Sequence, residues 1–176
     1  LTLLKGRGLL ALRLGFSRID GFREAWAEAI MAARQAGPFA SVEDLTFRAQ
    51  LPPPALRKLA DADAFGSLAY NRRDAVWEVR RTPPDQLPLF AAAGVPELGE
   101  EADAALPVMP PDEEVVADYQ TIRLSLKGHP VQFLRASLTR EGVLCCADAN
   151  AVPDGRKVKV AGVVLIRQRP GKGNAV

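Results

Sequence analysis

The sequence predicts a mainly α-helical protein with two units in which a hairpin turn joins two helices, followed by an acidic proline-rich linker, short helices and a final strand. Apolar residues recur at helical spacing on both sides of two glycine-containing turns. The segment Thr82 to Pro111 holds seven of the fourteen prolines and five acidic residues, a composition typical of a linker. Val158 to Ile166 is rich in valine, which favours a strand.

The first unit contains a short turn around Gly21 that runs directly into a helix ending near Gly37. The segment from Leu9 to Phe16 leads into this turn, and its sequence does not distinguish a helix from a strand. Free amides and the positive dipole end of the helix would suit a phosphate, as in a helix-hairpin-helix. An ordinary capped helix packed in a core is the alternative. One face of the helix is apolar at Phe22, Trp26, Ile30 and Ala33.

A second unit of the same kind is predicted further along the chain. Ser41 is expected to cap a helix that continues to about Gln50. Prolines 52 to 54 then break that helix and start the next one, which continues to Asp63. A turn over residues 64–68 follows, and Asn71 is expected to cap a last helix, Arg72 to Arg81.

Two arginines occupy the first turn of that last helix. Arg72 and Arg73 oppose the helix dipole there, which favours an anionic ligand over helix stability. The alternative is that they pair with nearby carboxylates, for which the candidates are Asp61, Asp63 and Asp74.

The linker contains the pentapeptide Gln86-Leu87-Pro88-Leu89-Phe90. Bulky apolar side chains in a solvated linker have no core of their own, so they suit a groove on another protein. Alternatively, they fold back on the helices. After the linker we expect a helix from Glu113 to Leu126, a short helix from Val131 to Leu138 and the valine-rich strand. The predicted domains are residues 1–81, the linker 82–111, a helical connector 112–140 and a final segment 141–176.

Charge is distributed unevenly, although the net charge of the 176 residues is only +2. Residues 1–81 carry thirteen basic and nine acidic side chains, and residues 120–176 carry ten and three. Residues 82–119 carry nine acidic side chains and no basic ones. The two basic blocks suit a polyanion, whereas the acidic stretch would be repelled by it.

Other classes of protein find little support in the sequence. Basic residues interrupt the apolar start of the chain, so we expect no signal peptide and no membrane span, and we interpret the chain as an internal piece of a longer cytoplasmic protein. Adjacent Cys145 and Cys146 with a single histidine, His129, make a structural metal site improbable. We find no carboxylate pair and no activated nucleophile in the sequence, so we expect no catalytic residues in this chain.

The order of these parts resembles the bacterial C-family DNA polymerases related to the polymerase III alpha subunit, and more closely their error-prone branch. The matching residues span nearly the whole chain: Leu12 to Phe16, Ile19 to Glu24, Gly37 to Phe39, Asp61 to Phe65, Asn71 to Trp77, Asp118 to Thr121, Leu124 to Pro130 and Val158 to Gly173.

The resemblance implies a non-catalytic, C-terminal fragment with a tandem helix-hairpin-helix that contacts the backbone of duplex DNA. The residues expected at the DNA are Gly21, Phe22, Arg23, Gly66, Arg72 and Arg73. Arg23 stands where the usual hairpin of this kind has a second glycine. Residues 141–176 would begin an OB-fold truncated after its first strand or two.

The resemblance also implies partners and a parent enzyme. The linker peptide would bind the sliding clamp through Gln86, Leu87, Leu89 and Phe90, directly or with accessory translesion proteins. The parent would carry out DNA synthesis past damage, with Mg²⁺ held by aspartates of an upstream palm domain and no cofactor in this segment. The alternative function is a non-enzymatic helical adaptor that recruits protein partners through the linker.

Overall fold

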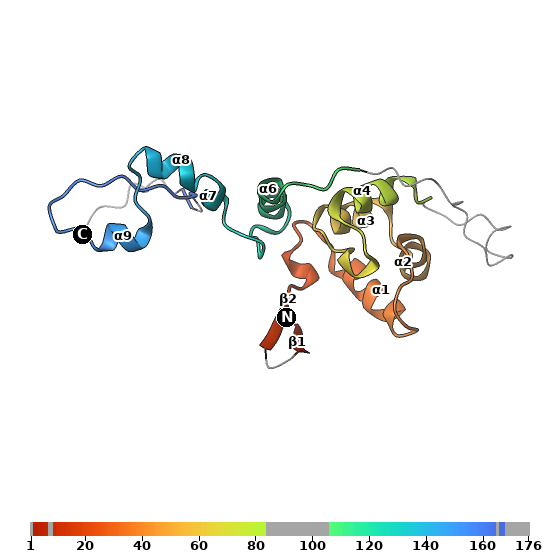
Figure 1. Ribbon diagram of the computed structural model, residues 1–176. Helices are drawn as coiled ribbons and strands as arrows, with labels where there is room; N and C mark the ends of the chain where they lie inside the picture. Colours follow the sequence, from red (N-terminus) through yellow and green to blue (C-terminus); the bar gives the residue numbers. More distant parts are fainter. Residues whose placement is uncertain (1, 7–8, 84–105, 165, 168–176) are drawn as a thin grey trace, which may run out of the picture. The chain divides into compact units, whose positions relative to one another are not determined.

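The computed structural model describes residues 2–6, 9–83, 106–164, 166 and 167, which form mainly helices, as predicted. The chain divides into two compact units, residues 1–126 and residues 127–176. Figure 1 shows the helices of each unit along the chain. In the described part of the chain, no helix has both the length and the apolar character needed to cross a membrane.

The first unit begins with a β-hairpin. Strands β1, Thr2–Gly6, and β2, Leu9–Arg13, pair antiparallel, with Thr2 opposite Arg13 and Gly6 opposite Leu9. A 3-10 helix, η1, follows at Phe16–Arg18. The segment whose secondary structure was ambiguous is therefore a strand followed by a 3-10 turn.

The next two helices form where the sequence predicts them. Helix α1 covers Glu24–Arg34, and α2 covers Val42–Ala49. Ser41 caps α2, because its Oγ accepts a hydrogen bond from the Asp44 amide at 3.0 Å. Arg48 of α2 holds the end of α1 by donating to the carbonyl oxygens of Ala33, Gly37 and Pro38 at 2.7 to 2.9 Å.

The second helix pair also follows local signals in the sequence. Helix α3 covers Pro53–Asp61 and α4 covers Arg72–Arg81, with a 3-10 turn, η2, at Gly66–Leu68 between them. The chain leaves α3 through a left-handed residue, Asp63, after which the Ala64 amide bonds to the Leu59 carbonyl at 2.9 Å. The Asn71 side chain caps α4, as predicted.

The core of this unit lies between the two helix pairs. Its buried residues come mainly from α2, α3 and α4, with Ile30 from α1: Ile30, Val42, Leu45, Ala49, Leu51, Ala55, Leu56, Leu59, Ala60, Phe65, Ala75 and Val79. The first turn packs on this core through Phe16, Ile19 and Phe22. Both turns are therefore fixed to one apolar centre.

Helix α6, Pro111–Ile122, belongs to the same unit, although the sequence interpretation placed it in a separate connector. Val115 is fully buried, and Asp118 forms a buried ion pair with Arg72 of α4. The helix ends four residues earlier than predicted, because Arg123 adopts a left-handed conformation with φ 63°.

The second unit contains three short helices: α7 at Pro130–Phe133, α8 at Arg135–Arg140 and α9 at Cys146–Asn150. Two helices thus replace the single one predicted from Val131 to Leu138, and α9 was not predicted. Described residues 157–164 form no strand, and their one β-bridge joins Lys159 to Val143. Val160 and Val164 are exposed, so the strand predicted for Val158 to Ile166 and the OB-fold start are not seen.

We expect Asp118→Ala to lower the free energy of unfolding of the first unit by about 3–5 kcal/mol, because it leaves the buried Arg72 charge without its principal partner. The matched control is Glu113→Ala, which removes the exposed partner of Arg73 and should cost less than about 1 kcal/mol. Urea unfolding followed by circular dichroism measures both. Equal, small effects would contradict a structural role for the buried pair.

Candidate nucleic-acid interface

The first hairpin is a tight turn that requires glycine at its third position. The Phe22 amide donates to the Ile19 carbonyl at 3.1 Å, and Gly21 has φ +67°. A side chain on Gly21 would also approach the Lys58 ammonium, because a Cβ atom built there lies 3.0 Å from Nζ. The turn therefore presents bare backbone beside a basic group.

Three backbone amides are available where this turn enters α1. Arg23 occupies the N-cap in an extended conformation, and its side chain does not cap the helix. The amides of Arg23, Glu24 and Ala25 have no backbone acceptor within the described residues, and all three residues are exposed. Such amides at the positive end of a helix dipole can bind an anion.

Basic side chains from distant parts of the chain surround the hairpin. Lys58 of α3 donates to the Asp20 carbonyl at 2.6 Å, and Arg123, just after α6, donates to the Asp20 carboxylate at 2.6 Å. Arg123 lowers the pKa of Asp20, first by this hydrogen bond and then by its charge. The Asp20 amide also donates to the Thr121 carbonyl at 2.9 Å. Sequence analysis missed Lys58 and Arg123, because they are 38 and 103 residues from Asp20.

Phe22 and Arg23 have different roles in the hairpin. The Phe22 ring stacks on Phe16 with 5.5 Å between ring centroids and meets Trp26 edge-on at 5.4 Å. Because its amide closes the turn and its ring packs inward, Phe22 anchors the hairpin and does not offer a phosphate contact. The exposed Arg23 guanidinium lies 5.0 Å from the centre of the Trp26 ring, a cation–π contact.

The second hairpin corrects the prediction for Arg72. Its side chain is only 4% exposed and pairs with Asp118 and Glu114, so it does not face a polyanion outside the protein. Arg73 bonds to Glu113 at 2.9 Å and to the Pro107 carbonyl at 2.7 Å. The structure thus shows pairing, as in the alternative interpretation, but the ion-pair partners are carboxylates of α6 and differ from the three carboxylates that the sequence suggested.

The remaining predicted positions divide into two groups. Gly66 is exposed, and a Cβ built on it would meet nothing within 4 Å, so this hairpin presents open backbone. Gln86, Leu87, Leu89 and Phe90 lie outside the described residues. Within the described ranges, no three His, Cys, Asp or Glu side chains are grouped to hold a metal ion.

The first glycine-containing turn joins η1 to α1, and the second joins α3 to α4, an arrangement consistent with a helix-hairpin-helix domain. A family model described as "Helix-hairpin-helix motif" matches residues 2–75, which include the first hairpin, the second hairpin and the start of α4. DNA binding is the activity that this motif suggests.

Curated relatives give a narrower identification. The chain is 53% identical over 168 residues to an error-prone DNA polymerase of Brucella abortus, 54% over 166 residues to one of Bradyrhizobium diazoefficiens and 50% over 186 residues to one of Rhodopseudomonas palustris. These matches cover 94–95% of this chain but only 14–16% of each relative. The chain is therefore homologous to a small segment of error-prone DNA polymerases, which confirms the resemblance found in the sequence.

We expect Gly21→Ala to lower the free energy of unfolding of the first unit by about 1–2 kcal/mol, because an alanine at φ +67° is strained. The control is Gly66→Ala, which has open space and no positive φ and should leave stability nearly unchanged. Thermal or urea unfolding of both variants tests this. A loss for Gly66→Ala as large as that for Gly21→Ala would show that the left-handed turn is not the cause.

Proposed function

We propose that the first unit binds the backbone of duplex DNA without reading its sequence, as one segment of an error-prone DNA polymerase. The observation that carries this proposal is the first hairpin, where exposed amides adjoin Arg23, Lys58 and Arg123. Contacts of this kind go to phosphates and position a protein on DNA, whereas sequence is read at base edges.

Phosphate binding at this hairpin would combine backbone amide donors with charged arginine side chains. The amides of Arg23, Glu24 and Ala25 supply fixed donors, and Arg23 supplies a charge beside them. Arg123 is held by Asp20 in an exposed ion pair, which contributes little to stability and can therefore open cheaply. A phosphate would compete with Asp20 for this guanidinium.

In this proposal the second hairpin would contact DNA mainly through its backbone and less through charged side chains. Gly66 and Ser67 are exposed at its turn, whereas Arg72 is committed to the interior and Arg73 to an exposed pair with Glu113. We therefore assign the principal electrostatic contact to the first hairpin.

The activity of the parent protein is part of the proposal. The named relatives, which are longer error-prone DNA polymerases, support DNA-templated DNA synthesis by the parent. We further propose that the parent is cytoplasmic and that its catalytic centre and Mg²⁺ site lie outside this segment. In this proposal the present chain holds the duplex while synthesis past damage proceeds elsewhere. Accessory translesion proteins would be further partners of the parent.

We also propose that the linker tethers the polymerase to its sliding clamp. Support comes from the sequence, where Leu87, Leu89 and Phe90 follow Gln86 in an acidic, proline-rich stretch. Two leucines and a phenylalanine could fill an apolar groove, each contributing about 1.5–3 kcal/mol before ordering costs. In the alternative, the chain is an adaptor that binds a protein partner through the linker peptide but does not bind DNA.

We expect Arg23→Gln and Arg123→Gln each to weaken binding to a duplex oligonucleotide and to reduce the slope of log affinity against log salt by about 1, because each removes one phosphate contact. Fluorescence anisotropy over a salt series measures both quantities. Arg34→Gln is the control, since Arg34 lies at the far end of α1 beside Phe39. Duplex affinity that ignores salt, or equal effects of all three variants, would refute the proposed interface.

Replacing Leu89 and Phe90 together by alanine should abolish binding to the sliding clamp and leave duplex binding intact, because the two contacts use separate segments. Surface plasmon resonance with immobilised clamp, and anisotropy with DNA, test the two functions. Clamp binding that survives the double substitution would refute the tether. Clamp binding without any duplex binding by the unaltered chain would favour the adaptor.

A further inference from the structure

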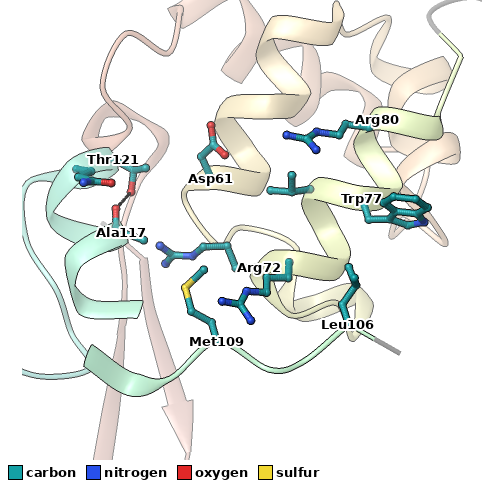
Figure 2. A pocket seen from close by; sticks show the side chains of 11 residues that line it. Asp61, Arg72, Trp77, Arg80, Leu106, Met109, Ala117 and Thr121 are labelled. Atoms are coloured by element: carbon teal, nitrogen blue, oxygen red, sulfur yellow. Dashed lines mark hydrogen bonds between the residues drawn. The ribbon is translucent and has the colours of Figure 1, made fainter. Parts of the chain in front are cut away.

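A groove of about 590 Å³ lies within the first unit, between α4 and α6. Figure 2 shows its lining, with Trp77 and Arg80 on α4, Ala117 and Thr121 on α6, and Leu106 and Met109 on the segment that leads into α6. This volume lies within the range of pockets that hold small organic ligands. None of the lining residues belongs to the first hairpin itself, although Thr121 of the lining accepts a hydrogen bond from the Asp20 amide.

One wall of the groove carries an aromatic side chain between two arginines. Trp77 is 47% exposed, and on α4 it has Arg73 four residues before it and Arg80 three residues after it. Residues at these spacings are neighbours on a helix. Arg80 is exposed and has no acidic partner within 4 Å among the described residues, and the pair of Arg73 with Glu113 is open to solvent.

Arg72 lines the same groove and carries two buried donor atoms without a hydrogen-bond partner. Its Nη2 atom pairs with Asp118 and Glu114, whereas its buried Nε and Nη1 atoms have no acceptor in the described part of the chain. Buried donors normally have partners. Because two carboxylates already offset its charge, these donors favour a neutral acceptor, such as a carbonyl oxygen, over a second anion.

We propose that this groove binds an unpaired nucleotide of single-stranded DNA. The base lies against Trp77 and the apolar lining, its keto oxygen accepts from Arg72, and the flanking phosphates pair with Arg73 and Arg80. Aromatic stacking combined with arginine contacts to the backbone is how proteins bind single strands. The choice of DNA over a peptide rests on the proposed function, but the residues involved are different.

Tryptophan fluorescence tests the groove directly, because the chain has only two tryptophans. In a Trp26→Phe background, oligo-dT should quench the fluorescence of Trp77. Adding Arg80→Gln should weaken oligo-dT binding about tenfold, through loss of one charge-assisted contact. Arg34→Gln, far along α1, should not weaken it.

A second substitution, made in the otherwise unaltered chain, distinguishes the two proposed DNA sites experimentally. Trp77→Ala should lose single-strand binding and keep duplex binding, because Trp77 is exposed and lies outside the hairpin. If the unaltered chain does not bind duplex DNA but oligo-dT still quenches the fluorescence of Trp77, the proposed duplex-binding function is refuted and the groove proposal is supported. Absence of quenching by oligo-dT, or quenching only by a peptide with the sequence of residues 86–90, would overturn the groove proposal.

Discussion

The arrangement of the first unit depends on the buried ion pair between Arg72 and the carboxylates of α6. Asp118 and Glu114 receive the guanidinium where little water can replace either partner. A buried pair of this kind contributes little net stability compared with apolar packing, but either member alone is costly. The pair therefore selects one position for α6 against α4, and α6 has few other large buried side chains besides Val115 to fix that position.

The position of α6 determines the surroundings of the first hairpin. With α6 fixed, the Thr121 carbonyl accepts the Asp20 amide, and the left-handed turn at Arg123 directs that guanidinium to the Asp20 carboxylate. The C-cap of α6 thus supplies one of the charges beside a hairpin near the start of the unit. These two elements are far apart in sequence, and the fold brings them together.

Local signals allowed most helices to be predicted, because capping and turn formation depend on neighbouring residues. Ser41 and Asn71 cap as expected, and Gly21 has the positive φ that its turn needs. Burial of Arg72, in contrast, depends on a carboxylate 46 residues away, and no local pattern indicates it. Valine content predicted a strand at Val158, but a strand also needs a partner, and the described residues supply only one bridge at Lys159.

Arg23 shows how this hairpin accommodates a side chain at the position of the expected second hairpin glycine. Its φ of −81° is open to any residue, so the backbone at this position has no need of glycine. The side chain turns onto the Trp26 ring and leaves the amides of the first helical turn uncovered. Only Gly21 carries the conformational requirement of the turn. The neighbouring position is therefore free to carry a charge, and in the proposed interface an arginine there would add long-range attraction for DNA to the short-range hydrogen bonds of the amides.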